Sequence, residues 1–519
     1  MNGMKKRIII DRNIDTIPTD YSWQFGLGND HAFQLHRTDV CEHVKLAHDE
    51  LGIRYLRFHG LFDDDMLTYQ RLSDYFRFRS MPYSRHIKEI NFRQVGHVLD
   101  NLLDCGVKPF VELSFMPTAL ARGRKIGLRY NNNITLPRSF DSWAEYVRKF
   151  IRFIEDRYGK EEIETWYFEV WNEPDLPIFF DGKQRDYFKL YEYTVRAIKD
   201  VNENLRVGGP STSSCRWLDD FITYCEKRGL PCDFVSTHHY VGDAFGNSFS
   251  FRDAFEIMKI AKYCARNAVP LGESITRFFF HPEVYRHWEK GALTRMDQEA
   301  RSRVGDRPLF ITEWNSMAVF GAPVHDEKYN AAFIVKTCLD LNGIADAYMF
   351  WCCSDIFEEL FMLGKPFVGS YGIITSDGIP KPSFWAFKLL SQLYPKRLKL
   401  SLTTNDTVEY AAFVDGNKTQ VIVYAQDFDY FKDETIDIEI SINCTAEKVI
   451  KQAIDDERCN PKAEWRKLGS PDHLTRSQVE EIKSKTRLTG EEMPFITENG
   501  STFVSLKLRT NDVVLLTFE

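Results

Sequence analysis

Short apolar runs alternate with amphipathic segments along most of the chain. The runs are apolar throughout, a pattern typical of strands buried on both faces of a parallel sheet. In the segments between them, apolar residues recur at three- and four-residue spacing, which predicts helices. The expected strands lie at residues 23–26, 53–60, 108–115, 166–171, 205–208, 233–240, 308–312 and 347–351. Eight strands with right-handed helical connections predict an α/β fold, a closed parallel (β/α)8 TIM barrel.

The helical segments have recognisable ends. The expected helices lie at residues 38–51, 92–105, 140–158, 187–201, 217–227, 329–341 and 382–394. Gly52 and Gly106 follow the first two, because glycine adopts the left-handed conformation that ends a helix without a steric penalty. The connection at residues 241–305 is longer than an ordinary loop and holds a further expected helix at 251–266. We expect this insertion to build one wall of a cleft.

After residue 395 the apolar spacing changes from helical to alternating. Every second residue from Ile436 to Ile442 is isoleucine, and Asp415-Gly416 joins two runs as a hairpin. This pattern predicts an antiparallel β-sandwich. A polar insertion at 455–500 is expected to hold one helix, at 471–486. The predicted domains are a barrel of residues 17–395 and a sandwich of residues 396–519, with residues 4–11 as a further strand of the sandwich.

Charge and composition exclude several classes of partner. The net charge is −8, from 67 basic and 75 acidic residues, so the chain lacks the basic surface that binds nucleic acid or an anionic membrane. No stretch has the apolar length of a signal peptide or a membrane span. The 11 cysteines are scattered and several fall in expected core elements, which is typical of reduced thiols in a cytoplasmic protein. The sequence leaves open whether the chain is a monomer or a homo-oligomer.

Two glutamates follow apolar runs that are expected to be barrel strands. Glu173 lies in Trp-Asn-Glu-Pro and Glu313 in Thr-Glu-Trp-Asn. A single glutamate after a strand is most often a loop carboxylate paired with Arg or Lys, but two among Trp and Asn favour a site. Strands four and seven lie roughly across the barrel mouth from each other, so we expect the carboxylates to face each other. Carboxylates about 5 to 5.5 Å apart are those of a retaining glycosidase, one as nucleophile and the other as acid and base.

Further polar and aromatic side chains are expected at the same rim, where they offer hydrogen bonds to sugar hydroxyls and a flat surface to sugar rings. These residues at strand ends are His59, Asn172, His238, Tyr240 and Trp351. A histidine taken alone is more often a satisfied core residue, and only the grouping at strand ends favours binding.

Other acidic residues are expected to be structural. Glu112 lies within its strand and is expected to be a buried structural carboxylate. Asp63-Asp64-Asp65 lacks a second ligand cluster, so an acidic loop before a helix is favoured over a metal site. No Cys-x-x-Cys or His-Glu-x-x-His motif occurs, and no metal or other cofactor is predicted.

Several motifs occur in the order seen in glycoside hydrolase family 39. Over about residues 20–395 the chain resembles the bacterial β-xylosidase branch of this clan A family, which is related to the α-L-iduronidases. The motifs are Arg57-Phe58-His59-Gly60, Pro109 to Pro117, Trp171 to Pro174, His238-His239-Tyr240, Thr312 to Asn315 and Ser354 to Glu359. The resemblance implies Glu173 as acid and base and Glu313 as nucleophile. The sugar contacts that it implies are His59, Phe115, Asn172, His238, Tyr240, Trp351, Glu358 and Glu359, with Glu359 favoured over Glu358.

The resemblance implies a retaining exo-β-D-xylosidase that acts on short xylo-oligosaccharides through a covalent glycosyl-enzyme. Activity on β-galactosides, β-glucosides or α-L-arabinosides stays open for two reasons. Residues 316–320 lack the tyrosine that often follows the nucleophile in these xylosidases, and the 241–305 connection is long. A non-catalytic carbohydrate-binding barrel is disfavoured, because both glutamates are present.

Overall fold

Eight parallel strands close a barrel in the computed structural model. Their order is β10-β11-β12-β3-β4-β7-β8-β9, which confirms the predicted α/β barrel. The strands are β3 (Gly26–His31), β4 (Tyr55–His59), β7 (Lys108–Glu112), β8 (Tyr167–Glu169), β9 (Arg206–Ser213), β10 (Phe234–Tyr240), β11 (Leu309–Asn315) and β12 (Ala347–Phe350). The structure describes residues 5–71, 88–241, 251–269, 274, 290–359, 364–400 and 406–519.

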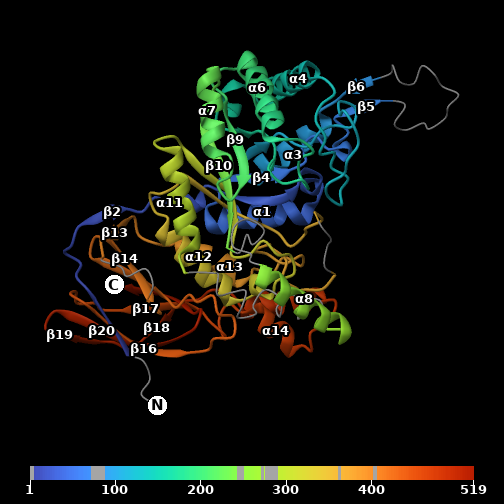
Figure 1. The fold of residues 1–519 in the computed structure, drawn as a ribbon. Helices are drawn as coiled ribbons and strands as arrows, with labels where there is room; N and C mark the ends of the chain where they lie inside the picture. The colour runs from blue at the N-terminus through green and yellow to red at the C-terminus, as the bar shows by residue number, and fades with distance from the viewer. Residues whose placement is uncertain are drawn as a thin grey trace.

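Helices surround the barrel (Figure 1). They are α1 (Thr38–Leu51), α3 (Arg93–Asp104), α4 (Phe140–Tyr158), α6 (Gln184–Val201), α7 (Leu218–Arg228), α11 (Ala292–Val304), α12 (Lys328–Asp340) and α13 (Pro382–Ser391), with α8 (Phe251–Arg266) in the long insertion. The helix α4 illustrates the pattern: Trp143, Val147 and Ile151 are buried on one face, and the Ser139 hydroxyl accepts a hydrogen bond from the N–H of Ser142. Gly52 ends α1 at φ 76°, as predicted.

An aromatic cluster closes the barrel below its mouth. Phe25, Phe110, Phe234 and Phe310 pack with Met349, and the ring centroids of Phe234 and Phe310 are 4.7 Å apart. Phe234 and Phe310 are the first residue of β10 and the second residue of β11. The carboxyl ends of the same strands carry polar side chains, at the end of the barrel where such folds have their sites.

The first barrel strand differs from the predicted one. Residues 22–24 form a short 3-10 helix, and β3 begins only at Gly26. A Cβ atom at Gly26 would lie 2.6 Å from the Met349 side chain, and one at Gly28 would lie 2.3 Å from the Trp351 ring. The neighbouring strand β12 fills the space that side chains of β3 would take, so β3 lacks the apolar run by which a buried strand is recognised.

Two further barrel elements were not predicted correctly. The strand β9 continues to Ser213, well past the predicted end at residue 208, because its last residues are polar and bury their side chains in the barrel. The helix α11 (Ala292–Val304) lies in the insertion, for which only the helix at 251–266 was predicted. Its sequence is mostly polar and gives a weak apolar stripe.

The carboxyl-terminal part forms two sheets. One has the order β1 (Lys5–Ile10), β16 (Thr435–Ile442), β20 (Ser501–Arg509), β19 (Ile496–Glu498). The other has the order β18 (Glu491–Glu492), β17 (Val449–Ile454), β21 (Val513–Phe518), β15 (Lys418–Tyr424), β14 (Glu409–Asp415), β13 (Lys396–Leu398), β2 (Thr16–Pro18). The predicted amino-terminal strand joins this unit, and it pairs with β16 in parallel, unlike the antiparallel pairs around it.

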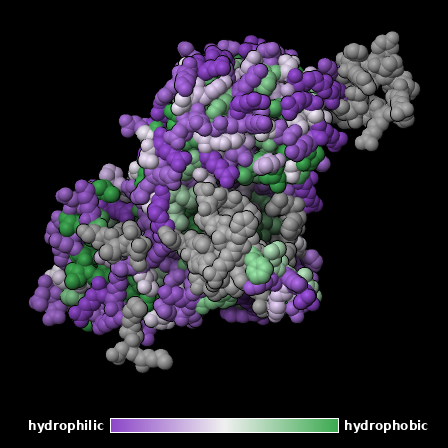
Figure 2. Space-filling view, viewed as in Figure 1, coloured by the Kyte–Doolittle hydropathy of each residue, from purple (hydrophilic) through white to green (hydrophobic). Residues whose placement is uncertain are grey.

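The insertion before β18 holds two helices where one was predicted. Asn460 caps α14 (Pro461–Lys467), and Thr475 forms a capping box at the start of α15 (Arg476–Lys485). Gly469 and Ser470, both at positive φ, end α14, and the helix predicted at 471–486 starts only at Arg476, after its cap Thr475. In Figure 2 hydrophilic residues cover most of the visible barrel surface, while apolar patches appear on the sandwich. Within the described ranges, the helices are all too short or too polar to cross a bilayer.

Candidate active site

Glu173 stands in a tight turn beyond the end of β8. The strand stops at Glu169, and both Trp171 and Glu173 adopt positive φ, at 72° and 38°. The Glu173 N–H donates to the carbonyl of Ser211 in β9 at 2.9 Å. The turn therefore lifts the carboxylate over the barrel mouth, where its side chain stays 10% exposed.

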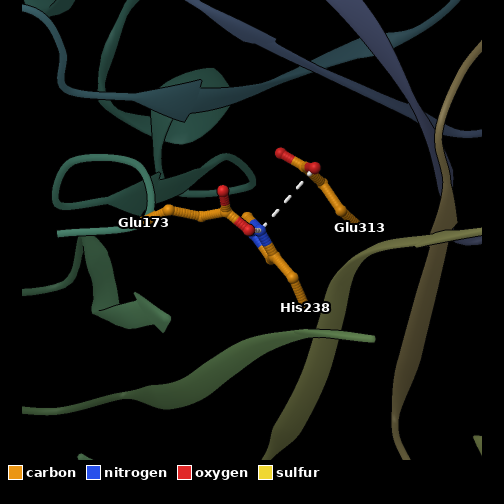
Figure 3. Close-up of side chains that lie close together, drawn as sticks. All are labelled: Glu173, His238 and Glu313. Atoms are coloured by element: carbon orange, nitrogen blue, oxygen red, sulfur yellow. Dashed lines mark hydrogen bonds and ion pairs between the residues drawn. The ribbon is translucent and has the colours of Figure 1, made fainter. Parts of the chain in front are cut away.

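Glu313 lies on the other side of the mouth, within β11. Its side chain is 6% exposed. One carboxylate oxygen of each glutamate and one nitrogen of His238 all lie within 4.8 Å of one another. His238 Nδ1 is 3.0 Å from Glu173 Oε1 and 3.6 Å from Glu313 Oε2, and Figure 3 shows the three side chains converging. The predicted pair of facing carboxylates is present.

Arg57 of β4 connects this pair to the barrel interior, and the sequence analysis gave it no role. The guanidinium is fully buried and lies 2.7 Å from Glu313, 2.7 Å from Glu169 and 2.8 Å from Glu112. The signal for it was a charged residue at an inward position of a predicted buried strand, where a cation is present only when it is paired.

The two glutamates have different electrostatic surroundings. Glu313 accepts hydrogen bonds from Arg57 Nη1 at 2.7 Å and from the Tyr240 hydroxyl at 2.8 Å. These donors stabilise a charged carboxylate. Glu173 lies beside His238, whose pKa burial and the nearby Arg57 and His59 hold well below its ordinary value.

His59 of β4 is oriented by Glu112. Its Nδ1 is 2.7 Å from Glu112 Oε2, while Nε2 faces Glu313 Oε1 at 3.6 Å. Burial opposes the charged imidazole, but the Glu112 carboxylate outweighs burial, and the pKa of His59 is raised. Glu112 is buried as predicted, and it both pairs with Arg57 and fixes the ring of His59.

Asn172 and Phe115 lie beside the glutamates. Asn172 Oδ1 accepts from Arg57 Nη2 at 2.9 Å, while its Nδ2 has no hydrogen-bond partner among the described residues. A buried amide N–H without a partner is suited to a ligand oxygen. Phe115 is fully buried, with its ring centroid 6.4 Å from that of His59 and 5.4 Å from that of Trp171.

An aromatic cluster forms the wall on the β12 side. The Trp351 ring packs over Gly28 and lies 4.7 Å from the His59 ring between centroids. Tyr240, Phe320, Phe357 and Tyr371 belong to the same buried cluster. Phe320 thus fills part of the wall in the segment where the sequence lacks the expected tyrosine.

Glu358 and Glu359 follow β12, and both are partly exposed. Removal from water and the negative charges of Asp30 and Glu313 raise the pKa of Glu359 to about 8, while His59 acts against them. The charge of Glu358 acts on Arg37, and its backbone N–H donates to Asp30. The charges of Glu313 and His59 therefore act on Glu359, whereas the partners identified for Glu358 are Arg37 and Asp30.

The arrangement does not favour a metal ion. Glu173, His238 and Glu313 are the set of three potential ligands within the part of the chain that the structure describes. Arg57 holds its positive charge 2.7 Å from Glu313, where it would repel a bound cation. Asp63-Asp64-Asp65 leads into a 3-10 helix of Asp64–Met66, with Asp65 3.3 Å from His31.

Comparison with known proteins places the chain among enzymes. The model of the glycosyl hydrolases family 39 matches residues 6–291 and 283–494. A β-xylosidase from Caldicellulosiruptor saccharolyticus is 34% identical over 506 residues, covering 96% of this chain and 95% of that protein. A β-xylosidase from Geobacillus stearothermophilus is 30% identical over 506 residues, covering 96% and 92%. The crystal structure of the GH39 enzyme from Xanthomonas axonopodis pv. citri superposes with a TM-score of 0.79 at 26% identity, covering 100% of this chain and 98% of that one.

Proposed function

The chain belongs to glycosyl hydrolases family 39, and from this premise we propose that it is a retaining exo-β-D-xylosidase acting on short xylo-oligosaccharides. The observation that carries the proposal is the pair Glu173 and Glu313, whose carboxylate oxygens lie within 4.8 Å of each other. A retaining glycosidase needs carboxyl groups about 5 to 5.5 Å apart, whereas an inverting one needs room for a water between them.

In the first step Glu313 attacks the anomeric carbon and Glu173 protonates the departing oxygen. Arg57 and Tyr240 donate hydrogen bonds to Glu313 and so hold its carboxylate in place for attack on the sugar. Tyr240 and His59 also lie where they can hold the sugar, and the free Nδ2 of Asn172 is available to a ring hydroxyl. The products are a covalent glycosyl-enzyme on Glu313 and a free leaving group.

In the second step water releases the sugar. Once Glu313 is esterified its negative charge is gone, and Glu173, now ionised, accepts a proton from the attacking water. His238, Phe115, Trp351, Glu358 and Glu359 complete the proposed sugar site, with Glu359 favoured over Glu358. The side chains supply both attack and protonation, so the proposal includes no metal or organic cofactor.

The choice of xylose is supported by the two relatives named β-xylosidase, each aligned over nearly its whole length. A panel of nitrophenyl glycosides tests this choice. We expect the β-D-xyloside to have the highest kcat/KM, ahead of the β-galactoside, the β-glucoside and the α-L-arabinoside. A higher kcat/KM on one of the other glycosides would contradict the choice of xylose, while the chain would still be a glycosidase.

The stereochemistry tests the mechanism on the same substrate. We expect NMR of the first-formed sugar to show β-xylose, because two displacements at the anomeric carbon retain its configuration. An initial α-xylose signal would mean a single displacement by water, and it would contradict the roles of Glu173 and Glu313.

A further inference from the structure

Ser211 lies between Arg57 and His238, directly behind Glu173. It is fully buried, and its Oγ is 3.1 Å from Arg57 Nη2 and 3.0 Å from His238 Nε2. Its carbonyl accepts the N–H of Glu173. The residue belongs to the polar end of β9 that the sequence pattern did not reveal, and the steps described above assign it no role.

The direction of the hydrogen bonds around Ser211 follows from what each group can do. A guanidinium donates and cannot accept, so the Ser211 oxygen accepts from Arg57. The hydroxyl keeps one proton, which it can donate to His238 Nε2, 3.0 Å away. Because its oxygen accepts from Arg57, Ser211 is left to act as the hydrogen-bond donor to His238 Nε2.

The direction of this hydrogen bond determines which nitrogen of His238 carries the proton. Burial, together with Arg57, His59 and His239, holds the pKa of His238 well below its ordinary value, so the ring is neutral. A neutral imidazole carries one proton, and a ring whose Nε2 accepts from Ser211 carries it on Nδ1. That N–H points at Glu173 Oε1, 3.0 Å away.

We propose that Ser211 is a positioning residue that fixes the tautomer of His238 and thereby directs its Nδ1–H at Glu173 Oε1, so that the acid proton of Glu173 is carried on the other oxygen, Oε2. This inference rests on the proposed function of Glu173. In the other tautomer Nδ1 would be an acceptor, and the proton of Glu173 would be held in a hydrogen bond to the imidazole instead of pointing at the glycosidic oxygen. The bond from Nδ1–H also stabilises the Glu173 carboxylate that acts as base in the second step.

The backbone provides an experimental advantage at this position. Ser211 has φ 55°, in the left-handed region where glycine is favoured over residues with a Cβ. Ser211→Gly therefore removes the hydroxyl and relieves the backbone, whereas Ser211→Ala removes the hydroxyl alone. Agreement between the two variants separates the effect of the hydroxyl from that of the backbone. Ser383→Ala is the matched control, because Ser383 is a buried serine of α13 outside the site.

The kinetic test compares leaving groups. Loss of proton donation matters for a leaving group that needs a proton and little for one that does not. For both Ser211 variants we expect kcat/KM to fall about 10- to 100-fold on phenyl β-D-xyloside, and less than about threefold on the dinitrophenyl xyloside. Ser383→Ala should match the wild type on both. Equal losses on the two substrates, or no loss on either, would overturn the proposal.

The spectroscopic test does not depend on turnover. With ¹⁵N in the histidine rings, the signals of His238 are those that disappear in His238→Gln. We expect wild-type His238 to carry its proton on Nδ1, and Ser211→Ala to lose this preference. A wild-type ring protonated on Nε2 would overturn the inference. If the wild type hydrolysed no glycoside, the proposed function would fail, and the ring signals would still decide the tautomer.

Discussion

At the scale of single residues, identical side chains acquire different chemistry from their neighbours. Glu313 lies within hydrogen-bond distance of Arg57 and Tyr240, which both donate to it. Glu173 has the neutral His238 at 3.0 Å. Because cations and hydrogen-bond donors favour an ionised carboxylate, the contacts of Glu313 support its proposed role as nucleophile, with Glu173 as acid and base.

Replacing each glutamate by alanine should therefore give different defects. Glu313→Ala is expected to lose nearly all turnover on every substrate, because no covalent intermediate can form. Glu173→Ala should still react with an aryl glycoside whose leaving group needs no proton, and then stall for lack of a base. Added azide should restore its turnover and yield a β-glycosyl azide, measured by product NMR.

The reverse pattern would exchange the roles. That pattern is azide rescue of Glu313→Ala with an inverted azide product, together with a Glu173→Ala variant inert even to activated glycosides. Ser383→Ala again serves as the control, since its buried side chain belongs to α13 and not to the barrel mouth.

The sequence indicated the glutamates more readily than the residues that support them. Glu173 and Glu313 follow recognisable apolar runs, so their place at the mouth could be predicted. Arg57 and Ser211 could not, because a charge or a hydroxyl inside a strand has a known role only when its partners are known. Those partners come from β7, β8, β10 and β11, which lie far away in the chain.

At the scale of elements, Arg57 joins four strands of the barrel. It lies on β4 and pairs with Glu112 of β7, Glu169 of β8 and Glu313 of β11, all essentially removed from water. Thr312 also donates to Glu169, at 3.0 Å. Three carboxylates around one cation are stable only while the cation is present, since an unpaired buried charge is strongly unfavourable.

Arg57→Met should accordingly destabilise the barrel as well as stop catalysis. We expect the free energy of unfolding in urea to fall by about 3 to 5 kcal/mol, because buried carboxylates are left without their partner. Arg54→Met, at an exposed position just before β4, should change it by less than about 0.5 kcal/mol. If Arg57→Met does not fold at all, the loss of stability is larger than expected but has the same direction. A free energy of unfolding equal to that of Arg54→Met would contradict the role of Arg57.

Helices and strands were predicted correctly where their packing requires a recognisable pattern of apolar residues in their own sequence. Helices such as α1 and α4 bury one stripe and have clear ends, so their bounds were predicted to the residue. The strand β3 was misplaced because its glycines make room for Met349 and Trp351, which are more than 300 residues away. The sequence of a strand does not reveal that side chains from another element pack over its glycines.

At the scale of the whole molecule, the sandwich is joined to the barrel through buried charges. Lys336 of α12 lies 2.9 Å from Glu409 of β14, and both side chains are about 5% exposed. Lys328, the first residue of α12, pairs with Asp512 at 2.7 Å. Since each of these charges depends on a partner from the other unit, we propose that the units are stable together, with the boundary near residue 395.

The amino-terminal strand β1 offers a test of whether changes in the sandwich affect the barrel. In β1 the side chains alternate, so that Ile8 is 1% exposed and Ile9 is 75% exposed, and Ile8 pairs with Ile440 of β16. Ile8→Asp places an unpaired carboxylate among the isoleucines of the sandwich. We expect it to lower the free energy of unfolding by about 3 kcal/mol or more.

Ile9→Asp makes the same chemical change one residue later, on the solvent side of the strand, and should alter that free energy by less than about 0.5 kcal/mol. Urea titrations followed by tryptophan fluorescence give both values. Below the transition both variants should keep the wild-type kcat/KM, because β1 contributes no side chain to the barrel mouth. Equal destabilisation by the two changes would contradict the register of β1. A loss of kcat/KM in folded Ile8→Asp would instead mean that the sandwich shapes the site, through the helix α12 that both units share.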